Sequence, residues 1–344
     1  MRTAFVVCVL LGLAGCTEAA TSSPNDDNPK APGKTHGDGG TSSTQNGGDA
    51  AQGENKNEES ADGGQAQAPT DAAVVATNNG FPTHWTDGLA CATDPKVQVW
   101  AYDESTYILR QSLCTSFEGP FVYLLLGQKK ALVLDTGTGT VDLAGAVTKI
   151  VTEWQTKIAA TSIDLVVAHS HGHGDHVGAD SQFKTLANTT VVGSSVTAVS
   201  QFFGITTWPT QEVTYDLGGR VLDIVPIPGH QAAHIAVYDR RTTVLLTGDT
   251  LYPGRLYIDN WAQYQPSVKR LTDFVHAGHP VAWILGGHIE LTAAGPDYVN
   301  GATKHASEHV LQLEAPILDE LNTAVQSMGA TPKRDPHPHF IISP

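Results

Sequence analysis

The sequence has 344 residues and a formal net charge of −15, with 20 Lys and Arg against 35 Asp and Glu. Residues 17–80 contribute ten acidic and three basic side chains, so about half of this charge belongs to that segment. Basic residues form no cluster, which argues against a surface for the phosphate backbone of a long nucleic acid. The roughly 260 residues that follow position 80 suffice for one large domain with a substantial core.

The first residues are typical of a signal peptide, residues 1–15, because the apolar run 4–13 is too short to cross a bilayer as a helix. Residues 13–16, Leu-Ala-Gly-Cys, resemble the lipobox of bacterial lipoproteins, in which Cys16 becomes the acylated first residue. The alternative is an ordinary signal peptide with an incidental cysteine. The resemblance implies a bacterial cell-envelope protein that contacts the membrane only through a lipid anchor. Thr17 after the cysteine resembles the pattern sorted to the outer membrane, and the domain would be periplasmic or surface-exposed.

Residues 16–80 are predicted to be the lipidated cysteine and a disordered linker. The segment is rich in Ser, Thr, Asn, Asp, Gly, Gln and Pro, and it has almost no large apolar side chain. It therefore cannot bury enough surface to offset the entropy of ordering its backbone. As a flexible coil it would span about 45 Å and hold the domain away from the membrane.

The predicted domain, residues 81–330, alternates strands and helices. Apolar runs predict strands at 97–102, 107–111, 121–126 and 131–134, then a helix at 141–156 and a buried strand at 163–168. Further strands are expected at 190–192, 221–226, 234–238, 243–247 and 282–285, and helices at 265–277 and 301–321. This mixture predicts two sheets covered by helices, a layered α/β architecture. Residues 331–344 are predicted to be a C-terminal tail that includes His337 and His339 in a disordered end.

Two cysteines remain for the folded part once Cys8 leaves with the signal peptide and Cys16 is acylated. An exported protein meets oxidising conditions, so we expect a disulfide between Cys91 and Cys114. The alternative is two separate buried thiols.

A dense group of metal-ligand side chains follows the strand 163–168, in the stretch 169–178, His-Ser-His-Gly-His-Gly-Asp-His-Val-Gly. His171 and His173, spaced by one residue, can direct two imidazoles at one ion, and imidazole and carboxylate are ligands that zinc favours. Asp175 and His176, at the start of the next helix, can face a second ion. The alternative is a His-rich surface loop, but such loops seldom follow a strand as apolar as this one.

Three further candidate ligands stand where later apolar strands give way to loops. They are His230 in Pro-Gly-His, Asp249 in Thr-Gly-Asp-Thr and His288 in Gly-Gly-His. Functional side chains are often held at such junctions by the rigid scaffold behind them.

With these residues in place, the chain resembles the hydrolases of the metallo-β-lactamase fold over residues 97–290. Their HxHxDH motif matches residues 171–176, and their later His, Asp and His match His230, Asp249 and His288. The resemblance implies a four-layer αββα sandwich with two metals at one edge between the sheets. It assigns the first metal to His171, His173 and His230, the second to Asp175, His176 and His288, and Asp249 as the bridge between them. The family also has an early aspartate, matched by Asp135, that plays a supporting or structural role.

This ligand set implies two Zn²⁺ ions, although iron or manganese could use the same ligands. A hydroxide shared by two such ions is formed near neutral pH, and the ions stabilise the negative charge that develops during its attack. Asp175 would be both a ligand and a catalytic residue that orients this nucleophile. The chain is therefore expected to be a metal-dependent hydrolase.

Other polar residues near the motifs could have either a role at the site or a structural role. Tyr252 stands where some lactonases of the superfamily place a phenol that stabilises the carbonyl oxygen, and the alternative is a packing tyrosine. Arg255 and Tyr257 could bind a substrate carboxylate, and a solvated loop is the preferred interpretation. His234 is expected to be a core or supporting histidine, and His169 to make a structural hydrogen bond. Two more pairs are expected at a helix end, His276 and His279, and on a helix surface, His305 and His309.

The predicted reaction is cleavage of an ester, thioester or lactone-type bond of a small molecule. The β-lactamases proper lack the bridging aspartate that Asp249 supplies, which disfavours β-lactam hydrolysis as an alternative. A phosphodiesterase would keep the same ligands, whereas the oxygen-reducing diiron relatives have Glu where His173 stands. From another class, a non-catalytic surface binding lipoprotein is the remaining alternative. The substrate and the oligomeric state are left open.

Overall fold

The computed structural model describes residues 72–75 and 80–344. The predicted signal peptide, Cys16 and most of the predicted linker lie outside the described residues. Strand β1 (Ala72–Val75) lies inside the segment predicted to be a linker, and it pairs in parallel with strand β2 (Val97–Asp103). No described helix is long and apolar enough to cross a membrane.

The N-terminal sheet has seven strands in the order of the chain, β1 to β7. Strands β2 to β5 form an antiparallel meander, and β5, β6 and β7 run parallel. After β2, the strands of this sheet are β3 (Thr106–Gln111), β4 (Phe121–Leu126), β5 (Lys130–Leu134), β6 (Asp164–Ala168) and β7 (Thr189–Val191).

The second sheet has five strands in the order β13-β11-β10-β9-β8, with β13 and β11 parallel and the other pairs antiparallel. A third sheet has three strands in the order β12-β15-β14. The strands of these two sheets are β8 (Val213–Asp216), β9 (Val221–Pro226), β10 (Ile235–Asp239), β11 (Val244–Gly248), β12 (Arg255–Tyr257), β13 (Trp283–Gly286), β14 (Asp335–Pro336) and β15 (Ile341–Ser343).

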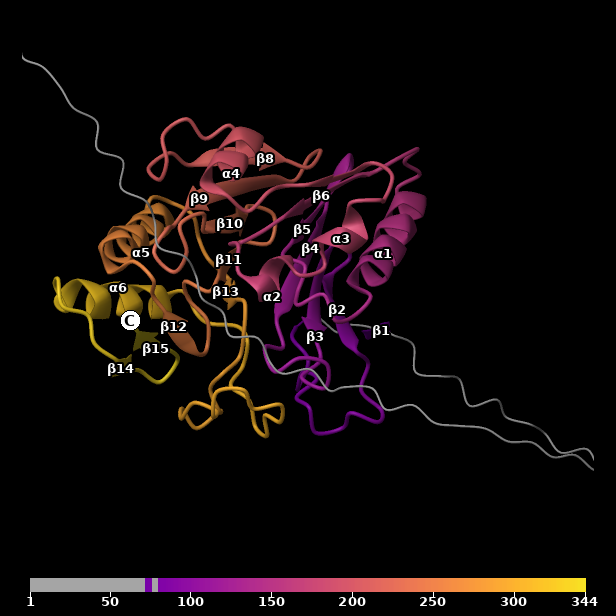
Figure 1. Ribbon diagram of the computed structural model, residues 1–344. Coiled ribbons are helices and arrows are strands. Elements are labelled where there is room, and N and C mark those ends of the chain that lie inside the picture. The colour runs from indigo at the N-terminus through magenta and orange to yellow at the C-terminus, as the bar shows by residue number, and fades with distance from the viewer. Residues whose placement is uncertain (1–71, 76–79) are drawn as a thin grey trace, which may run out of the picture. The chain divides into compact units, whose positions relative to one another are not determined.

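Helices lie on the outer sides of the two large sheets, as Figure 1 shows for α1 and α3 beside the first sheet and for α5 and α6 beside the second. Their first turns have side-chain caps where the sequence offers them: Asp142 accepts from the backbone of Gly145, and Asn260 from that of Gln263. The helices are α1 (Leu143–Lys157), α2 (Gly174–Val177), α3 (Asp180–Phe183), α4 (Val196–Phe203), α5 (Trp261–His276) and α6 (Pro316–Ser327).

Alternation along the strands divides the apolar residues among three cores. In β4, Phe121 and Tyr123 face the core between the two large sheets, whereas Val122 and Leu124 face α1 on the outside. Because successive side chains of a strand point to opposite faces, an all-apolar strand must be covered on both sides. The second sheet is covered in the same way by α5, α6 and the third sheet. The predicted four-layer αββα sandwich is thus the observed fold.

The C-terminal part of the chain departs from the sequence predictions. The predicted helix 301–321 is wrong, since α6 begins only at Pro316 and the preceding residues form loops and isolated bridges. The predicted disordered tail 331–344 is also wrong, because β15 pairs with both β12 and β14 and Phe340 is fully buried. His305 and His309, expected on a helix surface, are buried in a loop.

The predicted disulfide is present and joins Cys91 to Cys114. Cys114 lies in the loop between β3 and β4, and Cys91 lies in the segment that precedes β2. The bridge therefore ties the beginning of the domain to a loop that leads to the edge between the two large sheets.

A buried ion pair lies at the start of β9, and its arginine also reaches the first sheet. Arg220 donates to both carboxylate oxygens of Asp239, at 3.1 and 2.6 Å, and also to the backbone carbonyls of Ser105 and Leu126. The side chains of Arg220 and Asp239 are only 2% and 1% exposed. With this many hydrogen bonds, each charge is compensated inside the protein.

Replacing Asp239 with Ala is expected to lower the free energy of unfolding by about 3–5 kcal/mol, because Arg220 would keep a buried charge without a counter-charge. Urea unfolding followed by circular dichroism would measure the change. Asp273→Ala breaks a pair with Lys269 whose side chains are 62% and 58% exposed, and it serves as the control, with an expected change within about 0.5 kcal/mol. Equal losses in the two variants would contradict this role of the buried pair.

Candidate metal centre

The predicted ligands converge at one edge of the sandwich. His171, His173, Asp175 and His176 follow the carboxyl end of β6, and α2 begins among them at Gly174. The backbone carbonyl of His173 accepts from the amides of His176 and Val177, at 3.0 and 3.2 Å, so this first helical turn fixes the spacing of the motif. His230 follows β9, Asp249 follows β11, and His288 follows β13.

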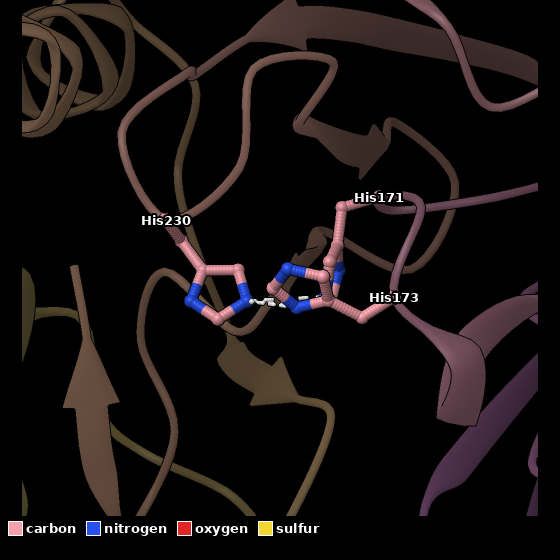
Figure 2. A group of neighbouring side chains, drawn as sticks. All are labelled: His171, His173 and His230. Carbon is pink, nitrogen blue, oxygen red and sulfur yellow. Dashed lines mark hydrogen bonds between the residues drawn. The ribbon is translucent and has the colours of Figure 1, made fainter. Parts of the chain in front are cut away.

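The first ligand group consists of His171, His173 and His230, whose ring nitrogens point toward one another (Figure 2). His171 Nε2 lies 3.0 Å from His173 Nδ1 and 3.1 Å from His230 Nε2, and the latter two atoms are 3.0 Å apart. Ligands at about 2.0–2.1 Å from a tetrahedral zinc lie about 3.3 Å from one another. This triangle is therefore close to the size that one metal ion requires.

The second ligand group consists of Asp175, His176, Asp249 and His288. Asp175 Oδ2 lies 3.3 Å from His176 Nε2 and 3.2 Å from His288 Nε2. His176 Nε2 and His288 Nε2 are 3.3 Å apart. These three atoms form a second triangle of the same size.

Asp249 lies between the two groups. Its Oδ2 is 3.9 Å from His171 Nε2, 3.7 Å from His230 Nε2 and 3.5 Å from His288 Nε2, and its Oδ1 is 3.5 Å from His176 Nε2. The residue is 6% exposed, and its Oδ1 is buried without a hydrogen-bond partner in the described part of the chain. A buried carboxylate oxygen in this state is strongly unfavourable unless a cation compensates it. The arrangement thus fits a metal site shared by both groups.

Four of the candidate ligands have pKa shifts that favour the form that binds a metal. Burial alone would raise the pKa of Asp249, but the neighbouring His288 and His176 hold that pKa well below its usual value. Burial likewise opposes ionisation of Asp175, whose pKa is lowered by hydrogen bonds from His176 and His288. Burial lowers the pKa of His171 and of His230, which keeps both imidazoles neutral. At His176 and His288 the neighbouring carboxylates, Asp249 first, outweigh burial and raise the pKa, so a metal that binds there must displace a proton from each ring. Ionised carboxylates and neutral imidazoles are the forms that ligate metals.

The outward-facing nitrogens of the ligand histidines are held by acceptors that sequence alone did not identify. His230 Nδ1 donates to the carbonyl of Tyr257 at 2.7 Å, and His288 Nδ1 donates to the carbonyl of Glu118 at 2.8 Å. Such bonds fix the tautomer and the ring orientation of a metal ligand. Because both acceptors are main-chain groups, no residue type in the sequence could have indicated them.

Asp135 supports the second ligand group, the role that the family resemblance implied for it. Its Oδ2 accepts from His176 Nδ1 at 3.0 Å and from the Ser170 hydroxyl at 2.8 Å, and its Oδ1 accepts from the Ser170 amide at 2.7 Å. Asp135 has a left-handed backbone, with φ of 72°, directly after β5. Asp tolerates this conformation better than most residues do, and here it turns the carboxylate under the ligand loop.

Because Gly287 has no side chain, the carboxylate of Asp249 can lie directly beside it. A Cβ atom at position 287 would lie 2.3 Å from Asp249 Oδ1 and 3.0 Å from His176 Cε1. Any larger residue there would displace the carboxylate between the two ligand groups. The glycine beside His288 is therefore a steric requirement of the site.

The catalytic role expected for Tyr252 does not agree with its position. The residue is 1% exposed, and its hydroxyl donates to the carbonyl of Arg255 and lies 3.1 Å from Glu290 Oε2. This phenol is engaged inside the protein, so the alternative of a packing tyrosine describes it. The prediction of a solvated loop around Arg255 is also wrong. Arg255 begins strand β12, and its guanidinium pairs with the carboxylate of Glu290 at 2.7 Å. Tyr257 is 40% exposed.

Two other histidines of the region have the structural roles expected of them. His169 Nε2 lies 2.8 Å from Asp180 Oδ1. His234 is fully buried, stacks on the ring of His171 at 4.8 Å and donates from Nε2 to the carbonyl of Thr247 at 3.2 Å. His276 ends α5, and His279 follows it closely, as predicted.

Asp135→Asn is expected to weaken metal binding at the second ligand group by about 10–100-fold, because His176 would lose the anion that orients it. Competition with a chromogenic chelator would measure the affinity. The matched control is Asp180→Asn, which alters the Asp partner of His169, a histidine outside both ligand groups. Equal metal affinities in the two variants would exclude the supporting role of Asp135.

Comparison with known proteins places these residues in a family. Residues 116–288, half of the chain, match the family described as "Metallo-beta-lactamase superfamily". Hydroxyacylglutathione hydrolase of Rhizobium meliloti is 27% identical over 48% of this chain and 65% of its own length. The protein of the same name from Methylococcus capsulatus is 32% identical over 30% of this chain and 42% of its own length. An acyl-coenzyme A thioesterase of Gallus gallus is 23% identical over 50% of this chain and 73% of its own.

Among solved structures, a metallo-beta-lactamase from Pontibacter korlensis has a TM-score of 0.44 and 17% identity, covering 67% of this chain and 99% of its own. The chain spans less than two thirds of the length of the two hydroxyacylglutathione hydrolases. The family match ends at His288, the last predicted ligand, and begins just before β4. The chain belongs to the metallo-β-lactamase superfamily.

Proposed function

We propose that the chain is a dinuclear metal-dependent hydrolase that cleaves a thioester of a small molecule. The observation that carries the proposal is the position of Asp249, whose buried carboxylate lies between two ligand groups of matching size. The seven ligands are those that the sequence predicted. The names of two relatives described above support a thioester as the bond that is cleaved.

The exposure of the candidate ligands indicates which of them can contact the attacking water. Two divalent ions at this site would lower the pKa of water and stabilise negative charge on the substrate carbonyl oxygen. The side chain of Asp175 is 20% exposed, against 0% for His176, 9% for Asp249 and 6% for His288. Asp175 is thus the carboxylate best placed to orient an incoming water.

A thioester is favoured over the other predicted bonds because two differently named relatives share it. One relative is a hydroxyacylglutathione hydrolase, and another is an acyl-coenzyme A thioesterase. Both names describe an acyl group joined to the sulfur of a thiol. Esters and lactones present the same carbonyl to the site, so weaker activity on them is expected.

A phosphodiester or a β-lactam is less favoured as the substrate than a thioester. None of the relatives named above is a phosphodiesterase by name. For β-lactams, Asp249 remains the residue that the β-lactamases proper lack.

The proposed metals are two zinc ions. Five imidazoles and two carboxylates form a nitrogen and oxygen donor set, which zinc accepts readily. Iron or manganese could occupy the same ligands, since affinity alone does not select among these metals.

The candidate metal centre of the purified wild-type protein is expected to hold about two metal ions, and His173→Ala should lose metal together with thioesterase activity. Elemental analysis would be combined with a panel of small acyl thioesters, aryl esters, lactones, a cephalosporin and an aryl phosphodiester. The matched control is His276→Ala, because this histidine is 60% exposed and lies outside both ligand groups.

Each result of this experiment has a defined meaning. Activity on thioesters that disappears in His173→Ala and persists in His276→Ala would support the proposal. Greater activity on the phosphodiester or the cephalosporin would replace the thioester. Bound metal without turnover on any class would favour the non-catalytic binding lipoprotein.

We also propose that the chain is a lipid-anchored protein of the bacterial cell envelope, on the basis of the lipobox-like residues 13–16. Cys16→Ser should then release the protein from the membrane fraction and abolish incorporation of labelled fatty acid. Fractionation of a bacterial host that expresses each form would show this. The same distribution for both forms would rule out acylation at Cys16.

A further inference from the structure

A second histidine contact lies outside the candidate metal centre, in the C-terminal part of the domain. His309 belongs to the loop before α6, and His339 lies in the turn between β14 and β15. His309 Nε2 is 2.9 Å from His339 Nδ1, and the rings meet edge to face with centroids 5.2 Å apart. Two segments thirty residues apart in the chain thus bring two ring nitrogens together.

The hydrogen bonding of His309 is that of a metal ligand. Its Nδ1 donates to the carbonyl of Val310 at 2.7 Å, so the lone pair of Nε2 faces His339. His230 and His288 are held in the same way, each by one backbone carbonyl on Nδ1. Burial lowers the pKa of His309, which favours the neutral imidazole that metals bind.

The spacing of this pair also resembles that of the candidate metal centre. The separation of 2.9 Å compares with 3.0 Å between His171 Nε2 and His173 Nδ1, which are likewise an Nε2 and an Nδ1 atom. The ring planes of both pairs are inclined at 85°. The geometry is therefore already close to that of two ligands of one ion.

The pair borders a cavity that has room for further ligands. Both histidines line a cavity of about 320 Å³ whose walls include Trp283, Leu313 and Glu314. Glu314 is exposed and carries a carboxylate on this wall. Water or this carboxylate could complete the coordination of an ion held by two imidazoles.

We propose that His309 Nε2 and His339 Nδ1 bind one divalent transition-metal ion, such as Zn²⁺, at a site separate from the candidate metal centre. The nitrogen donors select a borderline ion rather than Mg²⁺ or Ca²⁺, which prefer oxygen ligands. The ion would cross-link the turn before β15 to the loop before α6. Because binding would require the folded pairing of both segments, it would also stabilise the domain.

The test is a zinc count on untagged full-length protein, equilibrated by dialysis against micromolar free zinc and analysed by mass spectrometry of the metal. His339→Ala should bind one zinc ion fewer per chain than the wild type, and His309→Gln should lose the same ion. The matched control is His337→Ala, two residues away, because that imidazole pairs with Glu320 at 2.7 Å instead. It should retain the full count.

The thermal unfolding temperature provides a second measurement. Zinc should raise it less in His339→Ala than in the wild type, while both proteins unfold at similar temperatures in the presence of a chelator. Equal zinc counts in the wild type, His339→Ala and His309→Gln would overturn the proposal. Since the result is a difference between variants, it is independent of how many ions the candidate metal centre holds and of its activity.

Discussion

The edge between the two large sheets depends on the compensation of buried negative charge. Asp135 and Asp249 are 1% and 6% exposed, and ligand imidazoles surround them. A buried carboxylate is strongly destabilising unless it is paired, hydrogen-bonded or bound to a cation. Asp135 meets this condition through Ser170 and His176, whereas Asp249 Oδ1 has no hydrogen-bond donor in the described part of the chain. The same cations that would supply the chemistry would therefore also hold the two halves of the sandwich together at this edge.

The sandwich architecture explains how residues more than a hundred positions apart reach one place. The strands β5 and β6 of the first sheet, and β11 and β13 of the second, end at this edge, and each is followed by a residue of the site. The amide of Phe121 donates to the carbonyl of Gly287 at 2.9 Å, which joins the beginning of β4 to the loop of His288. Glu118, three residues earlier, holds the ring of His288 from the same side. The ligand positions are thus consequences of strand length and of a few main-chain contacts.

Sequence alone was sufficient where one segment determines its own structure. The strands 121–126 and 221–226 were predicted with their observed bounds, because their side chains are all or mostly apolar and must be buried; Asp223 is the one charged residue among them. The motif 171–176 was found because its ligands are contiguous. The prediction of a helix at 301–321 was wrong because distant residues decide this region: Glu308 pairs with Arg110, which lies 198 positions earlier. Short strands such as β15 were missed for a related reason, since Ile341 to Ser343 are ordered by pairing with β12 and not by their own pattern.

Two of the ligand histidines are held by backbone carbonyls. This explains why the sequence indicates the reaction more clearly than the substrate. His230 and His288 are oriented by the carbonyls of Tyr257 and Glu118, and a carbonyl is present whatever the side chain is. The side chain of Tyr257 is 40% exposed, and that of Glu118 is partly exposed beside the ligands. Both positions can therefore change the walls of the site without disturbing the metal ligands. Substrate choice then depends on residues that the ligand motifs do not constrain, while the chemistry depends on residues that they do.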